Sequence, residues 1–348
     1  MSPFLTYVLL FALGLGTTIT FASSHWFLAW VGLEINTIAI LPLMASLHHP
    51  RAIEATLKYF LTQATAASTL LFAATTNAWL TGQWDIQYMT DPFSVILFTL
   101  ALALKVGLAP LHVWLPEVLQ GLDLTTGLIL STWQKLAPFA LFAQITSHNG
   151  TLLIVLGLMS MFVGGWGGLN QTQLRKVLAY SSIAHLGWMV IILQFNPALS
   201  FLSLFMYIMM TFSTFLVFKW VSTTNINALA ISWAKAPAVT ALMPLVLLSL
   251  GGLPPLSGFM PKWLILQELS KQDLAATATL AALTALLSLY FYLRLSYAMT
   301  LTMFPNNSVG MLPWRFEPSQ ATLLFAASIT VTLASLPLTP SITALFFY

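Results

Sequence analysis

Long apolar runs separated by short polar connections repeat along the whole chain of 348 residues. A bilayer core requires roughly 20 apolar residues in a helix, and about eleven runs approach or exceed that length. They centre on residues 3–22, 25–45, 53–79, 92–115, 124–146, 151–170, 176–194, 197–219, 238–268, 275–302 and 320–345. Period-2 alternation is absent, which favours helices over a barrel. We therefore expect an all-α polytopic membrane protein, with residues 1–348 forming a single membrane domain.

Two of the runs are interrupted beside a lysine. Proline lacks a backbone N–H donor, and its ring clashes with the carbonyl four residues earlier. The prolines predicted to break the helices are Pro110 in the fourth run and Pro254, Pro255 and Pro261 in the ninth. Lys105 precedes the first break and Lys262 follows the second. We expect both helices to be broken near the middle of the membrane.

Breaks at matching places in two halves indicate an inverted repeat of the kind found in transporters. The fourth and ninth runs are equivalent if residues 1–150 form a first five-helix repeat and residues 151–302 form a second. Residues 303–348 then hold a loop and one extra C-terminal helix. The alternative is that Pro and Gly are simply common in membrane helices; the lysine beside each break favours the repeat.

Charges inside the apolar runs are the main candidates for function. Hydrophobic residues make up 58% of the chain, and Asp, Glu, Lys and Arg only 6%. Glu34, Lys105, Lys135 and Lys262 nevertheless lie within apolar runs. A charge at membrane depth costs at least about 2.5 kcal/mol, and its usual task there is moving ions or protons. We predict that these residues translocate protons, with Glu34 as a counter-charge to a lysine. The alternative for Glu34 is a structural role, in which Asn36 or a nearby hydroxyl is its hydrogen-bond partner.

A proton relay needs groups whose charge can change. A lysine with an ordinary pKa of about 10.4 keeps its proton at neutral pH, so its partner must influence when it releases that proton. His112 and His185 are possible members of a water-linked relay, because histidine titrates near neutral pH; the alternative is that both are hydrogen-bonded core residues. Glu54 and Lys58 have the spacing of a helical ion pair, although Lys58 could instead reach Glu34.

Other chemistries find little support in the sequence. The absence of cysteine excludes a disulfide framework, thiolate-held zinc and cysteine-ligated iron–sulfur clusters. The glycine cluster at residues 164–168 does not continue into a dinucleotide motif, and no GxxxxGK[ST] occurs; we interpret the cluster as close helix packing or a flexible kink. We expect no metal, no bound cofactor and no redox catalysis in this chain. Its net charge of +3 is scattered, which indicates no nucleic-acid partner.

Loop charges predict the orientation, because Lys and Arg gather on the side of synthesis. With eleven spans, one side holds Arg51, Arg175, Lys176, Lys219, Lys235 and Arg315, and the other holds Lys271. We therefore expect the N-terminus on the side of synthesis and the C-terminus across the membrane. The apolar N-terminal segment has no signal or transit-peptide pattern, so we interpret it as a retained first helix.

Four segments carry a family resemblance. They are KVGLAPLHVWLPEV from Lys105, STWQKLAPF around Lys135, RKVLAYSSIAHLGWM from Arg175 and GGLPPLSGFMPKW around Lys262. In this order, and over the whole chain, they closely resemble the mitochondrially encoded second subunits of respiratory complex I, the proton-pumping NADH:ubiquinone oxidoreductase. This family is antiporter-like and similar to the Mrp-type cation/proton antiporters.

The resemblance implies a core membrane-arm subunit in the mitochondrial inner membrane, with its N-terminus in the matrix and its C-terminus in the intermembrane space. It implies that Glu34, Lys105, Lys135 and Lys262 lie along a hydrated axis and move protons in response to quinone reduction elsewhere. NADH, FMN, iron–sulfur clusters and ubiquinone would then belong to partner subunits. The implied partners are neighbouring antiporter-like and small membrane subunits, accessory subunits, and lipids such as cardiolipin. Two alternatives stay open, a stand-alone cation/proton antiporter and a structural scaffold without its own proton path.

Overall fold

The computed structural model describes residues 2–46, 48–89, 91–145, 150–234, 237–301 and 323–347. Over these ranges the chain forms α-helices and short 3-10 segments, with isolated β-bridges as its only β-structure. The all-helical architecture predicted from the apolar pattern is therefore confirmed. The chain divides into two compact units, Met1–Leu156 (unit 1) and Gly157–Tyr348 (unit 2), and the boundary falls within a helix.

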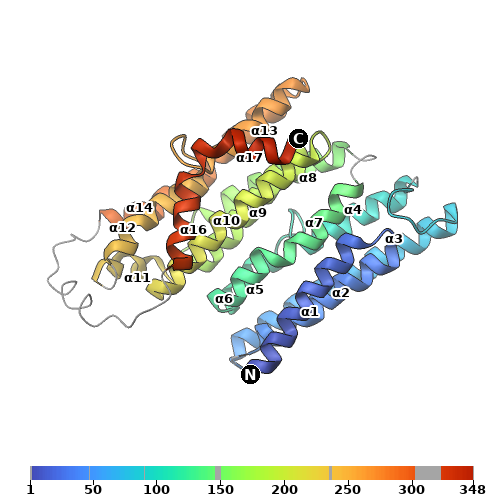
Figure 1. The fold of residues 1–348 in the computed structure, drawn as a ribbon, viewed down its shortest axis with the longest axis horizontal. Helices are drawn as coiled ribbons and strands as arrows, with labels where there is room; N and C mark the ends of the chain where they lie inside the picture. The colour runs from blue at the N-terminus through green and yellow to red at the C-terminus, as the bar shows by residue number, and fades with distance from the viewer. Residues whose placement is uncertain are drawn as a thin grey trace. The chain divides into compact units, whose positions relative to one another are not determined.

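Unit 1 begins with α1 (Pro3–Ala22), α2 (Trp26–Met44) and α3 (Pro50–Thr81) (Figure 1). His25 and His49 are the N-caps of α2 and α3, and the ring Nδ1 of each accepts a hydrogen bond from a backbone N–H two residues later. Such caps satisfy donors that have no partner within the helix. Both histidines therefore have a local structural role at a helix end.

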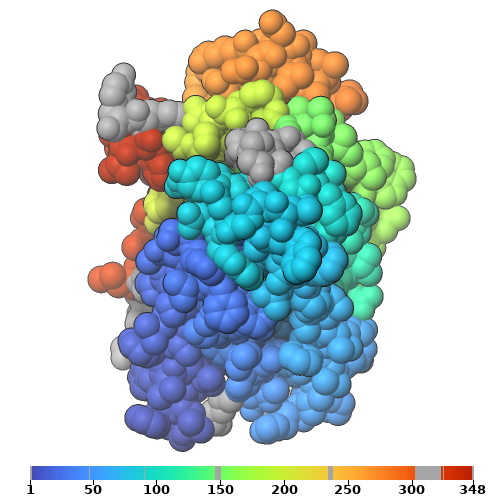
Figure 2. All heavy atoms as spheres, turned by 90° about the vertical axis from the view of Figure 1, so that its right-hand side faces the viewer, coloured from blue at the N-terminus to red at the C-terminus, as the bar shows by residue number. Residues whose placement is uncertain are grey.

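The helices α1 and α2 approach closely through glycines. A Cβ added to Gly16 would lie 2.8 Å from the carbonyl oxygen of Gly32 and 2.4 Å from Asn36 Oδ1. Small residues allow such backbone contact between membrane helices. The opposite face of α1 exposes Phe4 and Tyr7, and Figure 2 shows this helix, in dark blue, on the surface of unit 1. An exposed apolar face is what a helix next to lipid requires.

The other helices that lie wholly in unit 1 are α4 (Pro92–Val106), α5 (Trp114–Gly121), α6 (Leu124–Ser131) and α7 (Trp133–Ile145). The apolar run 124–146, expected as one helix, is divided at Thr132 into α6 and α7. The Thr132 hydroxyl donates to the Leu128 carbonyl at 2.7 Å. Thr62 and Thr211 make the same bond within continuous helices, so this bond does not by itself divide the run, and periodicity alone does not reveal the division.

The next helices are α8 (Gly150–Gly168), α9 (Leu174–Leu193), α10 (Pro197–Val221), α11 (Ile226–Ala230), α12 (Pro237–Gly251), α13 (Phe259–Lys271) and α14 (Ala275–Thr300). The glycine cluster at 164–168 ends α8. A Cβ added to Gly164 would lie 2.6 Å from the backbone nitrogen of Ala184 in α9. The close-packing interpretation of this cluster is therefore confirmed.

The C-terminal segment differs from the single helix expected over 320–345. It forms α16 (Leu323–Ala334), the 3-10 segment η3 (Leu336–Leu338) and α17 (Thr339–Phe347). The two helical parts are bent by 64° relative to each other. The ring of Pro337 would clash with the carbonyl of Leu333 in a continuous helix, which explains why α16 ends at Ala334.

Within the described residues, six helices are long and apolar enough to cross a membrane, and the bent C-terminal pair would make a seventh. They are α1, α2, α8, α9, α10 and α14. The multi-pass membrane character expected from the sequence is therefore confirmed in this coarser form. Lys235 and Arg315, used in the loop-charge count, lie outside the described residues.

Each unit has one isolated β-bridge, and the two bridges join connections between helices in the same way. His25 pairs with Asp85 in unit 1, and Gln173 pairs with Asn225 in unit 2. Each bridge has two backbone hydrogen bonds, both of 3.0 Å in unit 1 and of 3.0 and 3.2 Å in unit 2. The first joins the connection before α2 to the connection after α3, and the second joins the connection before α9 to the connection after α10.

Candidate functional site

Glu34 of α2 and Lys105 of α4 form an ion pair within unit 1. Lys105 Nζ lies 4.0 Å from Glu34 Oε1, and the two side chains are 2% and 24% exposed, respectively. The Thr37 hydroxyl lies 3.1 Å from Glu34 Oε2, so it can donate to the other carboxylate oxygen. The two roles considered for Glu34, counter-charge and partner of a nearby hydroxyl, therefore occur together.

Lys105 occupies the last turn of a helix that stops abruptly. Gly107 has φ +88°, a left-handed conformation that glycine adopts without a Cβ penalty. The N–H groups of Gly107 and Leu108 both donate to the Ala103 carbonyl at 2.9 Å, which closes the end of α4. Pro110 lies in the segment between α4 and α5. The negative end of the α4 dipole favours a cation in this turn.

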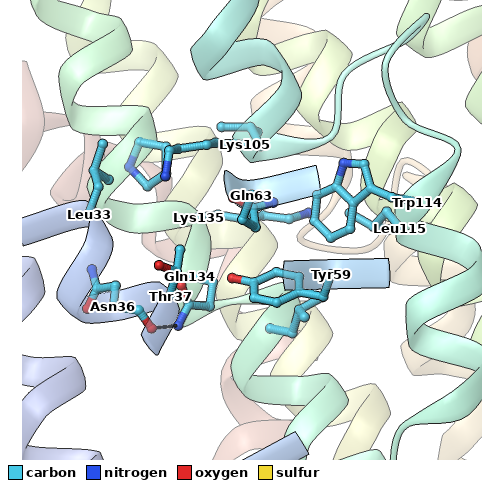
Figure 3. Close-up of a pocket in the computed structure, with 13 residues that line it drawn as sticks. Leu33, Asn36, Thr37, Tyr59, Gln63, Lys105, Trp114, Leu115, Gln134 and Lys135 are labelled. Carbon is cyan, nitrogen blue, oxygen red and sulfur yellow. Dashed lines mark hydrogen bonds between the residues drawn. The ribbon is translucent and has the colours of Figure 1, made fainter. Parts of the chain in front are cut away.

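Lys105 and Lys135 line the same cavity in unit 1 (Figure 3). The volume of this cavity is about 10 Å³, close to the space that one buried water requires. Its polar lining also includes Asn36, Thr37, Tyr59, Gln63 and Gln134. Lys135 belongs to the first turn of α7 and is only 3% exposed. The structure thus brings three of the four predicted charges, Glu34 included through its pair with Lys105, into one polar neighbourhood.

Two amides of this cavity, Gln63 and Gln134, were not among the residues predicted from the sequence. Gln134 Nε2 donates to the Asn36 backbone carbonyl at 3.2 Å, the dashed line in Figure 3, and joins α7 to α2. Gln63 comes from α3 and is 4% exposed. A single uncharged amide in an apolar run is the signal that could have identified them, because a buried polar group needs a partner.

Lys262 occupies the corresponding place in unit 2 but has a different partner. Its Nζ donates to the Gly251 carbonyl at 2.8 Å, at the C-terminal end of α12. Gly252 has φ +81°, and a Cβ added there would lie 2.9 Å from Lys262 Nζ. The N–H groups of Gly252 and Leu253 both donate to the Leu248 carbonyl, at 3.1 and 3.4 Å. The second break therefore closes with the same hydrogen-bond pattern as the first.

The prolines of the second break do not all lie in it. Pro254 and Pro255 belong to the irregular segment between α12 and α13. Pro261 is instead the third residue of α13, where a proline is compatible with a helix because the first turn has unpaired N–H groups. Pro261 was predicted to break the helix, but it lies in the first turn of α13 instead.

The two histidines considered as relay residues have different surroundings. His185 and Lys262 line one cavity of about 10 Å³ in unit 2. The His185 ring packs against that of Tyr207, with 5.5 Å between centroids. His112 lies between α4 and α5 and is not among the residues that line the unit 1 cavity. The structure thus places His185 beside a predicted lysine, and His112 outside the cavity that Lys105 and Lys135 share.

Two further basic side chains, Lys58 and Arg294, also have defined partners. Lys58 pairs with Glu54 at 2.8 Å, as predicted, and with Glu117 at 2.8 Å. The alternative that Lys58 reaches Glu34 is therefore wrong. Arg294 lies within the apolar run 275–302 but was not among the charges predicted to be functional. Its guanidinium donates to the Leu169 carbonyl at 2.6 Å and so caps the connection after α8.

Clusters of metal-ligating side chains are absent from the part of the chain that the structure describes. No group of three or more His, Cys, Asp or Glu residues there could hold a metal ion. A larger cavity in unit 2, of about 400 Å³, is lined by Pro254, Phe259, Met260, Trp263, Leu264, Leu336, Thr339, Pro340 and Thr343. None of these residues titrates. The two small cavities with buried lysines are therefore the better candidates for proton chemistry.

Comparisons with known proteins agree with this geometry. Residues 23–288 match the family model described as NADH:quinone oxidoreductase/Mrp antiporter, TM, and residues 289–343 match that of the NADH dehydrogenase subunit 2 C-terminus. The chain is 70% identical to NADH-ubiquinone oxidoreductase chain 2 of Tetraodon nigroviridis over 99% of both chains.

Solved structures show the same fold. A chain of respiratory complex I from Thermus thermophilus is 30% identical, with a TM-score of 0.85 over 99% of this chain and 80% of that chain. A chain of the Mrp complex from Dietzia sp. DQ12-45-1b is 20% identical, with a TM-score of 0.75 over 85% of this chain and 60% of that one, which shows a shared fold. The buried lysines, the broken helices and these matches together show that the chain belongs to the NADH:quinone oxidoreductase/Mrp antiporter family, among its NADH-ubiquinone oxidoreductase chain 2 members.

Proposed function

We propose that this chain is a membrane-arm subunit of a proton-translocating NADH:ubiquinone oxidoreductase, in which Glu34, Lys105, Lys135 and Lys262 translocate protons. The observation that carries the proposal is the buried Glu34–Lys105 pair, which lies at the end of an interrupted helix beside a cavity shared with Lys135. Membership of the family supports the same function. The chain takes part in enzyme activity as a subunit of the whole complex.

The pair allows one charge to control another. At an effective dielectric of about 20, two unit charges 4 Å apart interact by about 4 kcal/mol. A membrane potential of 100 mV imposes about 2.3 kcal/mol on one charge that crosses it. A change in the charge or position of Glu34 therefore alters the proton affinity of Lys105 by an amount comparable with the gradient. Protons released by Lys105 enter the cavity that Lys135 also lines.

The redox chemistry belongs to partner subunits in this proposal. NADH, FMN, iron–sulfur clusters and ubiquinone bind elsewhere, and this chain receives only the electrostatic or conformational consequence of quinone reduction. Glu34 suits that input because its side chain is 24% exposed, whereas that of Lys105 is 2% exposed. The proposed partners are neighbouring antiporter-like and small membrane subunits, accessory subunits, and lipids such as cardiolipin.

We also propose an inverted repeat within an eleven-span topology. Two observations support it: both breaks close on a left-handed glycine, Gly107 or Gly252, and a β-bridge joins equivalent connections in each unit. Residues 1–150 and 151–302 form the repeats, and residues 303–348 follow them. The location is the mitochondrial inner membrane, with the N-terminus in the matrix and the C-terminus in the intermembrane space.

The decisive experiment is NADH-driven proton pumping by the assembled complex with Lys105→Met. Met keeps the length of the side chain without its charge, and we expect pumping to fall at least about tenfold, equivalent to about 1.4 kcal/mol or more. Lys271→Met is the matched control, because the Lys271 side chain is 60% exposed and pairs with Glu268 within α13. Native gels establish that both variants assemble.

Two outcomes would contradict the proposal. Unchanged pumping by an assembled Lys105→Met complex would favour a structural scaffold. Cation/proton exchange by the purified chain alone in vesicles would favour a stand-alone antiporter, the second candidate. The dependence of exchange on partner subunits separates that candidate from the proposed function.

A further inference from the structure

Gln63 is a buried amide that the mechanism above does not use. It lies on α3 with 4% of its surface exposed, one helical turn after Tyr59, which is 2% exposed. Both residues line the cavity that Lys105 and Lys135 share. Figure 3 shows their side chains extending from α3 into this space. An amide in this position faces the two lysines rather than lipid.

The amide and the first lysine both have unsatisfied donors. Neither Gln63 Nε2 nor Lys105 Nζ has a hydrogen-bond partner among the described residues, and both atoms are inaccessible to solvent. Glu34 Oε1, which lies 4.0 Å from Lys105 Nζ, likewise accepts no hydrogen bond from the described residues. Buried donors and acceptors are costly to leave without partners, so three such atoms around one ion pair require an explanation.

One water molecule in this cavity satisfies the two donors of the set, Gln63 Nε2 and Lys105 Nζ. The cavity volume of about 10 Å³ is close to the minimum that holds a water, and a buried water typically makes about three hydrogen bonds. Its oxygen accepts from the Gln63 amide and from the Lys105 ammonium, and its hydrogens are free to donate. A neutral guest is favoured over an anion because Glu34 already balances the charge of Lys105.

We propose that Gln63 is a positioning residue for proton transfer: its side-chain amide holds a buried water between Lys105 and Lys135. This inference rests on the proposed function. When the proton moves, an N–H bond of Lys105 breaks as an O–H bond of the water forms. The water then releases a different proton to the neutral amine of Lys135, so an N–H bond forms there and the water is regenerated.

The test compares three variants of Gln63 and of a matched glutamine in the assembled complex. Gln63→Met keeps the unbranched shape of the side chain and removes the amide, whereas Gln63→Asn retains an amide. Gln267→Met makes the same change at an exposed position of α13. We expect NADH-driven pumping to fall roughly three- to tenfold in Gln63→Met, as for loss of one typical hydrogen bond between neutral groups. Pumping should stay above about half of the wild-type rate in Gln63→Asn and Gln267→Met, the first because an amide still reaches a water.

A second measurement does not depend on the rate. High-resolution maps of the complex should show an ordered water within hydrogen-bond distance of Gln63 Nε2 and Lys105 Nζ, and that density should be lost in Gln63→Met. Pumping in Gln63→Met equal to that of Gln267→Met would overturn the inference, as would an equal loss in Gln63→Asn, which would indicate a packing role. If Lys105→Met still lowers pumping in either case, only the role of Gln63 fails and the proposed function stands.

Discussion

The two interrupted helices have the same ending but hold their lysines against different partners. Each N-terminal half ends at a left-handed glycine, Gly107 or Gly252, whose N–H and that of the next residue donate to one carbonyl. Lys105 precedes its break and faces the carboxylate of Glu34. Lys262 follows its break and donates to the backbone carbonyl of Gly251.

This difference separates a variable partner from a fixed one. A carboxylate can change its charge by binding a proton or by moving, whereas a backbone carbonyl keeps the same partial charge throughout. The proton affinity of Lys105 therefore depends on another ionisable group. Lys262 instead donates to a carbonyl that the geometry of the break holds in place, so the two lysines should respond differently to loss of their partners.

The largest expected effect is a loss of assembled complex in the variant Gly252→Ala. A left-handed conformation costs a non-glycine residue about 1–2 kcal/mol, and the new Cβ would lie 2.9 Å from Lys262 Nζ. Overpacking adds about 1–3 kcal/mol, so the second break loses at least about 2 kcal/mol and we expect the amount of assembled complex to fall by more than about tenfold. Quantitative native gels measure this loss.

Gly82→Ala is the control, because Gly82 has φ +74° but a Cβ there would meet nothing within 4 Å. It should lower assembly less than Gly252→Ala. Gly107→Ala tests the other break, where the nearest atom to the new Cβ would be Leu115 Cδ1 at 2.9 Å. Equal losses at Gly82 and Gly252 would show that close packing on Lys262 is irrelevant to the stability of the second break.

A smaller effect, on proton pumping and not on assembly, is expected from Glu34→Gln. This change keeps the shape and leaves the buried Lys105 without a counter-charge, which raises the cost of its charged form. We expect pumping to fall about tenfold, the equivalent of about 1.4 kcal/mol in the transfer step, with assembly retained because the Glu34 side chain is partly exposed. Proton pumping per NADH oxidised measures the effect.

Glu117→Gln is a matched control for Glu34→Gln, since the 46% exposed side chain of Glu117 pairs with the exposed Lys58. It should leave pumping nearly unchanged. If Glu34→Gln also leaves pumping unchanged while Lys105→Met abolishes it, then Glu34 does not control the proton affinity of the first lysine, and the contrast between the two breaks loses its functional meaning.

The smallest effect is a loss of stability expected from Asp91→Ala at the N-terminus of α4. The carboxylate accepts hydrogen bonds from the Ser94 N–H at 2.8 Å and the Ser94 hydroxyl at 2.6 Å, and these bonds lower the pKa of Asp91. Loss of an N-cap typically costs about 0.5–2 kcal/mol. Because a lowered pKa stabilises the folded state above the unfolded pKa of about 3.9, this contribution is lost as the pH falls through the folded value.

Thermal inactivation of the complex at neutral pH and below about pH 3.9 measures this contribution. Asp91→Ala should be less stable than wild type at neutral pH, and this difference in stability should become smaller as the pH falls. Asp91→Asn should recover part of the stability, because asparagine is also a good N-cap. A gap that widens in acid would contradict the assigned direction of the pKa shift.

Prolines show why some interruptions were predictable and others were not. Pro42, Pro138 and Pro244 all lie inside α-helices that continue past them. The two breaks beside the buried lysines occur where a proline follows a glycine in the left-handed conformation, Gly107 or Gly252. A proline removes one hydrogen bond, and at these two breaks the reversed backbone is accepted by the glycine, a conformation that packing must select.

The apolar pattern by itself determined the membrane class, the helical architecture and the presence of buried charges, because hydrocarbon tolerates only backbones whose hydrogen bonds are satisfied internally. It also indicated Glu54 as a partner of Lys58, since a spacing of four residues is local. Only the tertiary structure decided that Glu34 faces Lys105, that Lys262 faces a carbonyl, and that Gln63 enters the cavity of the first lysine. These contacts join residues far apart in the chain, and their geometry depends on how whole helices pack.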